Sequence, residues 1–146
     1  MNNGQIRKYI KPGFTLVEIM IVLVILGLLA GLVVPRLAGR ADQARVQKIE
    51  ADLATLATAL SLYQLDNRQL PTTAQGLQAL QVKPSTPPVP QSYKASGYIE
   101  SMPIDPWGQN YLYLSPAEFT AGEYDLFTFG ADGKKGGEGQ DADVFR

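Results

Sequence analysis

Gly13-Phe14-Thr15-Leu16-Val17-Glu18 opens the longest apolar run of this 146-residue chain. The sixteen residues from Ile19 to Val34 then carry neither a charge nor a hydrogen-bonding side chain. Together with residues 14–18 they would form a helix about 31 Å long, which is close to the hydrocarbon thickness of a bilayer. We therefore predict a transmembrane helix over residues 14–35.

The charges around this run predict its orientation. Arg7, Lys8 and Lys11 precede it, and no acidic residue occurs before Glu18. The positive-inside rule then places the N-terminus in the cytoplasm and the residues after Pro35 on the other side of the membrane. A cleaved secretory signal peptide is an alternative, but an acid within the apolar region and the lack of an A-x-A-like site disfavour it. A plain membrane anchor is a second alternative.

Glu18 needs a physical explanation of its own. A carboxylate inside an apolar helix is costly unless it is paired, protonated or close to the lipid headgroups. Cleavage between Gly13 and Phe14 would free an α-amino group at the start of the helix. In a stack of subunits, that amine would pair with Glu18 of a neighbour and would set the axial register.

The composition restricts the possible functions. The chain has no cysteine and no histidine, which excludes disulfides, thiol nucleophiles and Ser/His or Cys/His catalysis. Its net charge of −1 gives no basic field for nucleic acid, so no nucleic-acid partner is expected. We expect a protein that is not an enzyme, although an enzyme with aspartate as acid and base stays open.

Beyond Pro35 the chain becomes amphipathic. Apolar residues recur at steps of three and four and would lie on one helical face, namely Val46, Ile49, Leu53, Leu56, Leu60 and Tyr63. We predict one helix from about Phe14 to Leu65, with its second half packed in a globular head; a two-stranded coiled coil is the alternative. Gly27 and Gly31 form a G-x-x-x-G pattern, which permits close helix contact or, with Pro35, a hinge.

The rest of the chain predicts a small α+β head. Thr72-Thr73-Ala74-Gln75 fits a capping box for a short helix through about Gln81, and a proline-rich surface loop follows over residues 83–92. Residues 111–114 and 125–129 are typical of strands. The predicted fold class is α+β, with a long N-terminal α-helix (transmembrane half plus amphipathic half) packed on a small antiparallel β-sheet.

The segment from Gly130 to Asp143 is rich in glycine and acid. Its carboxylates and free carbonyls are the oxygen ligands that Ca²⁺ takes, but the spacing is not that of an EF-hand. A solvated acidic turn is the alternative.

The N-terminal motif resembles the leader of type IV pilins and pseudopilins, in which a short basic peptide ending in Gly precedes Phe-Thr-Leu-Val-Glu and an apolar helix. The resemblance implies that prepilin peptidase cuts after Gly13 and that Phe14 is N-methylated. It also implies that Glu18 is the assembly glutamate, and that the fold is pilin-like.

Segments of the head resemble the major pseudopilins of type II secretion systems. They are Leu70-Pro71-Thr72-Thr73, Gln75-Gly76-Leu77, Gly97-Tyr98-Ile99, Asp105-Pro106-Trp107-Gly108 and Gly130-Ala131-Asp132-Gly133. The organisation expected from this resemblance is a class III leader over residues 1–13, a transmembrane and assembly helix over residues 14–35, and a periplasmic head over residues 36–146.

This family's function implies a set of partners and a location. The subunit would lie in membrane lipid of the inner membrane with its head in the periplasm, and then self-associate into a helical filament that pushes folded proteins across the outer membrane. Minor pseudopilins, prepilin peptidase and the inner-membrane secretion platform would be its partners. A type IV or competence pilin, and a membrane-anchored periplasmic protein that never polymerises, are the alternatives.

The resemblance also implies a metal site in the C-terminal loop. Asp132, Asp141 and Asp143 match acidic positions of the calcium loop of major pseudopilins, and the carbonyl of Phe129 is a further ligand there. Calcium is thus the expected cofactor.

Overall fold

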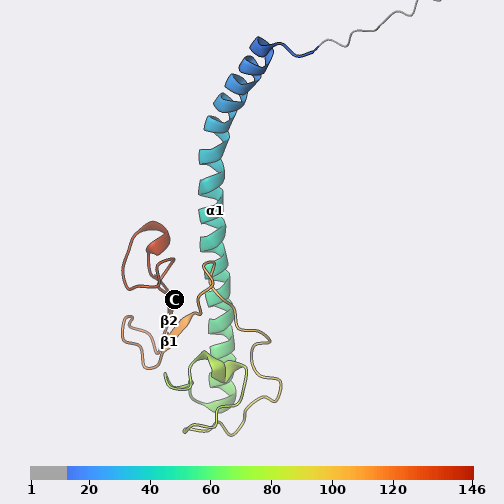
Figure 1. Cartoon of the computed structure of the whole chain (residues 1–146). Helices are drawn as coiled ribbons and strands as arrows, with labels where there is room; N and C mark the ends of the chain where they lie inside the picture. The colour runs from blue at the N-terminus through green and yellow to red at the C-terminus, as the bar shows by residue number, and fades with distance from the viewer. Residues whose placement is uncertain (1–12) are drawn as a thin grey trace, which may run out of the picture. The chain divides into compact units, whose positions relative to one another are not determined.

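The computed structural model describes residues 13–146, and within residues 32–39 it describes the backbone only. A single helix, α1, runs over Leu16–Asn67 (Figure 1). The chain divides between Arg40 and Ala41 into an N-terminal unit and a compact head, residues 41–146. The head contains the second half of α1, two short 3₁₀ helices and three strands.

The helix confirms the predicted stripe in the head. Ile49, Leu53, Leu56, Leu60 and Tyr63 are all buried and form the centre of the hydrophobic core. Val46 is the exception, because half of its surface stays exposed at the start of the head. The helix ends two residues beyond the expected Leu65, where Arg68 takes the left-handed conformation (φ 60°) and donates its amide to the carbonyl of Gln64.

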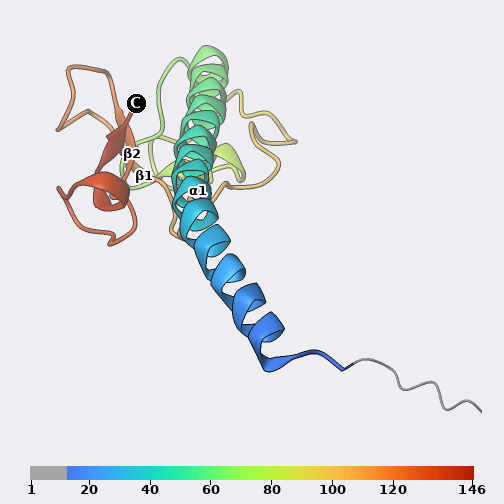
Figure 2. The same cartoon turned by 90° about the horizontal axis from the view of Figure 1, so that it is seen from above.

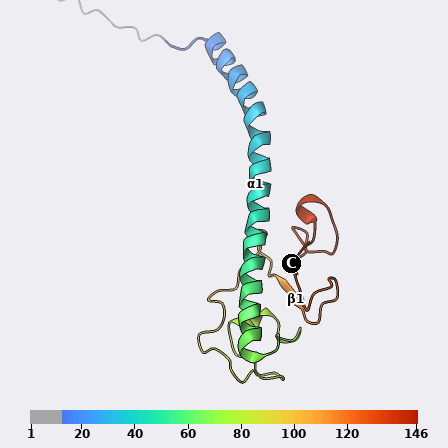
Figure 3. The same cartoon turned by 180° about the vertical axis from the view of Figure 1, so that it is seen from behind.

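A three-stranded antiparallel sheet packs against α1 in the head. Its strands are β1 (Leu112–Leu114), β2 (Asp125–Thr128) and β3 (Val144–Phe145), in the order β1-β2-β3. Figures 1 and 3 both show the sheet on one side of α1, and Figure 2 shows the proline-rich loop on the opposite side of α1 from the C-terminal segment. The first two strands confirm the prediction, which did not include β3.

The predicted capping box forms, and the predicted short helix follows it over part of the expected range. Thr72 and Gln75 exchange side-chain to backbone hydrogen bonds of 3.1 and 3.2 Å. The helix that follows is a 3₁₀ helix, η1 (Leu77–Leu80), because Gly76 has φ 59° and ψ −167° and interrupts α-helical geometry. The buried Gln75 amide also donates to the carbonyls of Thr86 and Pro88, and so it anchors the proline-rich loop.

Two buried carboxylates organise the loops around the sheet. Asp105 accepts the amides of Trp107 and Gln109 and thereby closes the turn before β1. Asp125, which is fully buried, accepts the amides of residues 118–120 and the Thr120 hydroxyl at 2.6–2.9 Å. Burial alone raises the pKa of Asp125, but these hydrogen bonds outweigh it and hold the pKa below its ordinary value.

Candidate functional site

The start of α1 is closed by a reciprocal capping box. The amide of Glu18 donates to the Thr15 hydroxyl at 3.2 Å, and the amide of Thr15 donates to the Glu18 carboxylate at 3.5 Å. Thr15 is therefore the N-cap and Glu18 the third helical residue, a position where the helix dipole also favours negative charge. The sequence interpretation treated Glu18 only as a charge awaiting a neighbour. The T-x-x-E spacing was the signal that it missed.

The predicted cleavage position lies just ahead of this box. Gly13 and Phe14 are outside regular secondary structure, and Phe14 is 79% exposed. A Cβ built on Gly13 would meet no atom within 4 Å. The peptide bond between them is accessible from solvent. Residues 1–12, which include the basic leader residues, lie outside the described part of the chain.

The helix from Leu16 to Gly31 has no cover from the described residues. Every side chain in this stretch is exposed, and a Cβ at Gly27 or Gly31 would meet no atom within 4 Å. The backbone of α1 continues without a break through residues 27–35, the segment predicted as a hinge. Glu18 makes no ion pair with any described residue, since the two pairs found there are Asp42–Arg45 and Lys48–Asp52.

The structure describes the side chains of only part of the predicted membrane span. Among the residues whose side chains the structure describes, no helical stretch has both the length and the apolarity needed to cross a bilayer. The last four residues of the predicted span, 32–35, lie outside that set.

The C-terminal loop holds the predicted metal ligands. Asp132 accepts the amide of Lys134 at 3.0 Å, and both carboxylate oxygens of Asp143 lie 3.0 Å from the amide of Gly136. Asp141 ends the second 3₁₀ helix, η2 (Gly139–Asp141). These donors are oxygen only, as calcium requires. In the described residues, however, no three acidic side chains come close enough together to hold a metal ion.

Amide side chains that the sequence interpretation did not single out tie this loop to the head. Gln109 donates to the carbonyl of Gly130 at 2.9 Å, and Gln140 donates to Asp42 of α1 at 3.0 Å. Gly130 (φ 73°) approaches the chain so closely that a Cβ there would lie 2.7 Å from the Gln140 carbonyl oxygen. The loop is therefore closed on itself and fixed at both ends.

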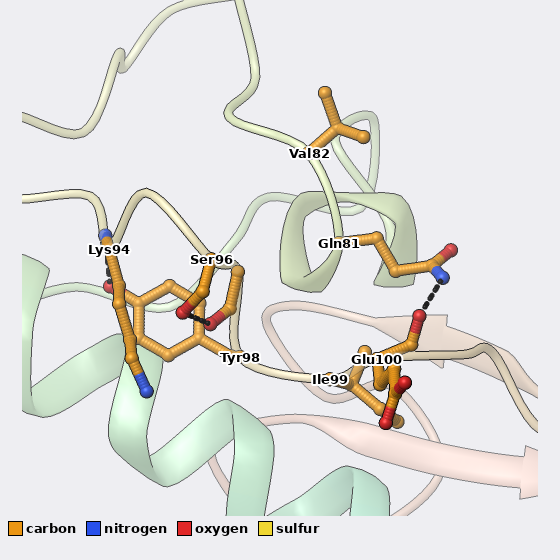
Figure 4. A pocket seen from close by; sticks show the side chains of 8 residues that line it. Gln81, Val82, Lys94, Ser96, Tyr98, Ile99 and Glu100 are labelled. Atoms are coloured by element: carbon orange, nitrogen blue, oxygen red, sulfur yellow. Dashed lines mark hydrogen bonds between the residues drawn. The ribbon is translucent and has the colours of Figure 1, made fainter.

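A surface pocket of about 630 Å³ is lined by the two residues that follow η1 and by residues between 94 and 100 (Figure 4). Gln81 donates to the carbonyl of Glu100 across it, and the Lys94 amide donates to the Tyr98 hydroxyl. Lys94 and Glu100 are the charged residues among its lining, and none of the predicted site residues reaches it. Its open, polar walls offer no arrangement of nucleophile and base.

A capped apolar helix ahead of a small α+β head is the architecture of a pilin-like filament subunit. Comparison with known proteins narrows this class. The prokaryotic N-terminal methylation motif matches residues 11–34, and the family of type II secretion system protein G matches residues 36–146. The chain belongs to this protein G family, which confirms the resemblance seen in the sequence.

Individual relatives agree with the family match. Type II secretion system core protein G of Pseudomonas aeruginosa is 51% identical over 134 residues, covering 92% of this chain and 93% of the relative. That of Vibrio cholerae serotype O1 is 53% identical over 134 residues, covering 92% and 90%.

A solved structure confirms the predicted fold class. It is the crystal structure of the major pseudopilin from the type 2 secretion system of enterohaemorrhagic Escherichia coli, which is 42% identical to this chain. The similarity has a TM-score of 0.66 and covers 78% of this chain and 96% of that one. The matched family is that of a type II secretion system, and not a family of type IV or competence pilins.

Proposed function

We propose that this chain is the major structural subunit of a type II secretion pseudopilus, and that its polymerisation helps to push folded proteins across the outer membrane. The observation that carries the proposal is the uncovered apolar helix over residues 16–31, joined to a head whose own core is closed. Such a helix requires lipid or other subunits around it, because its apolar surface is unfavourable in water. The family membership supports packing against other subunits once the filament has assembled.

Processing is the first step of the proposal. Prepilin peptidase would cut between Gly13 and Phe14 and N-methylate the new terminus, and the exposure of both residues supports access by an enzyme. Mass spectrometry of the mature protein should give an N-methyl-Phe14 terminus. An intact leader on the chain recovered from filaments would contradict this step.

Before assembly, the subunit would be a single-pass protein of the inner membrane, with its N-terminus in the cytoplasm and its head in the periplasm. The apolar residues 14–35 and the basic residues before them support this topology. Alkaline phosphatase fused after residue 146 should be active, since that enzyme requires the periplasm. An inactive but stable fusion would reverse the orientation.

Glu18 would then set the register between subunits. Its capping box keeps the carboxylate at the start of α1, where a neighbour's N-terminal amine would meet it. Glu18→Ala should still be cleaved but should assemble poorly, and normal filaments from it would remove Glu18 from this role. If the wild-type chain is processed but never sediments as filaments, the result would instead support the alternative of a membrane-anchored protein that does not polymerise.

Minor pseudopilins, prepilin peptidase and the inner-membrane secretion platform are the proposed partners, as the family's place in a secretion machine implies. No catalytic activity is part of the proposal. If the chain were instead an enzyme, alanine at Asp132, Asp141 or Asp143 would abolish a turnover without changing thermal stability.

We also propose that the C-terminal loop binds Ca²⁺ through Asp132, Asp141, Asp143 and the carbonyl of Phe129. The oxygen-only donors and the closed loop support it. Calcium would supply a positive charge that braces the acidic loop. The chain's own residues already hold the loop through Gln109 and Gln140, so the metal would add to an existing closure.

A further inference from the structure

The face of the sheet that points away from α1 carries an aromatic cluster of its own. Leu126 and Phe127 are neighbours on β2 and both are buried, but only Leu126 belongs to the core formed with α1. Successive side chains of a strand point to opposite faces of the sheet, so Phe127 lies on the outer face. Three other rings surround it there, with centroids 5.0–5.6 Å from its own, namely Phe119, Phe129 and Phe145. We name these four phenylalanines the outer cluster.

Phe119 is the member of the outer cluster that comes from the loop between β1 and β2. Its ring stands edge-on to Phe127 and Phe145, with centroids 5.6 and 5.7 Å apart, and so it bridges β2 and β3 from outside. The backbone beneath the ring is fixed, because the amides of residues 118–120 donate to the buried carboxylate of Asp125. Phe119 is nevertheless 41% exposed, so part of its ring stays open to other groups.

The side chain of Lys135 lies over that ring. Its Nζ is 4.4 Å from the centroid of Phe119, which is within the range of a cation–π contact. Lys135 belongs to the middle of the C-terminal loop, residues 130–143, whose two ends are tied to the rest of the head by side-chain amides. Among the described residues, the hydrogen bonds of residues 134–138 all stay inside this loop. The contact with Phe119 therefore gives the middle of the loop a link to the sheet that no hydrogen bond provides.

We propose that Phe119 and Lys135 form a latch, which couples the C-terminal loop to the loop over residues 115–124 so that the two open and close together. A loop that is held only at its ends opens locally at low free energy, and the latch adds a third attachment at its middle. The coupling is reciprocal, so whatever orders one loop also stabilises the other. The latch lies within the head, and it depends neither on filament assembly nor on bound calcium.

Amide hydrogen exchange of the detergent-solubilised full chain, measured with a chelator present, tests the latch. Lys135→Met keeps most of the aliphatic stem and removes the charge. The protection factors of the Gly136 and Asp141 amides, which bond within the C-terminal loop, should fall about twofold to fivefold, as expected for the loss of an exposed cation–π contact. Those of residues 118–120 should fall by a similar factor, because the two loops open together. Lys134→Met is the matched control, since Lys134 is the exposed neighbour of Lys135, and it should leave both loops unchanged.

A double-variant cycle tests whether the two side chains act as one contact. Phe119→Leu keeps an apolar side chain but removes the aromatic face, and it should lower the same protection factors by at least as much as Lys135→Met. The double variant should fall no further than Phe119→Leu alone, because both substitutions remove the same contact. The amides of Leu56 and Leu60 in the core show whether each variant is still folded.

Three results would contradict the proposal. Unchanged protection of the C-terminal loop in Lys135→Met would overturn the latch. Losses that add in the double variant would show that Phe119 and Lys135 act separately, and would overturn it as well. A loss in Lys135→Met that is confined to the C-terminal loop, with residues 118–120 unchanged, would overturn the coupling between the two loops.

Discussion

The hydroxyl of Thr128 donates to the carboxylate of Asp105 at 2.7 Å, and both side chains are buried. This bond joins the turn before β1 to the middle strand of the sheet. The other oxygen of Asp105 is already occupied by the amides of Trp107 and Gln109. The Thr128 hydroxyl therefore satisfies an oxygen that would otherwise be buried without a partner.

Replacing Thr128 by valine should show how much the hydrogen bond to Asp105 stabilises the head. The shape is nearly kept, but one carboxylate oxygen of Asp105 loses its donor, so we expect the free energy of unfolding to fall by about 1–3 kcal/mol. Urea denaturation followed through the one tryptophan, Trp107, gives the measurement. Thr58→Val is the control, since the Thr58 hydroxyl bonds only its own helix at an exposed position. Equal losses in both variants would contradict the prediction.

Asp125 should make the folded head less stable as the pH falls. Its pKa is lowered in the folded state from an ordinary value of 3.8, so the fold favours the ionised carboxylate. This contribution is complete above that value and is lost as the pH falls through the folded pKa. Asp125→Asn should be less stable near neutral pH and should lose less stability than the wild type below about pH 4.

Gly97 should be far less replaceable than Gly108, although both have positive φ (71° and 87°). A Cβ at Gly97 would lie 2.8 Å from the Gln81 carbonyl oxygen and 3.0 Å from that of Leu80, whereas at Gly108 it would meet nothing within 4 Å. Gly108→Ala should cost about 1–2 kcal/mol from backbone strain alone. Gly97→Ala should cost clearly more, because η1 must also move. The melting temperatures of the two variants, measured side by side, test this order. Equal losses would contradict it.

Calcium removal should lower the melting temperature of the detergent-solubilised chain if the proposed loop site exists. At a free concentration one hundred times the Kd, the metal would add about 2.7 kcal/mol to the stability. Asp132→Asn and Asp143→Asn should lose the calcium-dependent shift, while Glu138→Gln, in the same loop, should retain it. A melting temperature that a chelator does not change would leave the loop as a solvated acidic turn.

The capping box of Thr15 and Glu18 should stabilise the start of α1. Thr15→Val removes the acceptor for the Glu18 amide and should weaken the first helical turn by about 1 kcal/mol, whereas Thr15→Ser keeps it. Amide hydrogen exchange of residues 16–19 should therefore be faster in the valine variant alone. Equal exchange in both variants would show that the box does not stabilise the helix start.

The sequence was most informative where structure follows from local periodicity. The stripe from Ile49 to Tyr63 predicted the core face of α1, because an α-helix repeats every 3.6 residues. The runs of aromatic and aliphatic residues within 111–114 and 125–129 predicted β1 and β2. The box of Thr15 with Glu18 is equally local, because its T-x-x-E spacing is visible in the sequence alone.

The remaining features depend on contacts between distant residues. Strand β3 exists because Val144 and Phe145 pair with β2, and a two-residue run carries no periodic signal of its own. Gln109 and Gln140 hold the C-terminal loop through bonds to Gly130 and Asp42, which no spacing along the chain announces. The predicted ligands Asp132, Asp141 and Asp143 share that loop, but their spacing could not tell whether their carboxylates converge.

The anchoring of the proline-rich loop has a practical meaning for anyone who labels this protein. Gln75 holds that loop through the carbonyls of Thr86 and Pro88, so the bond depends on the main chain and not on which side chains the loop carries. Sequence drift in the exposed stretch at residues 83–89 should therefore be well tolerated, whereas drift at Gln75 should not. An epitope tag inserted at the loop's exposed tip would let intact filaments be captured by antibody.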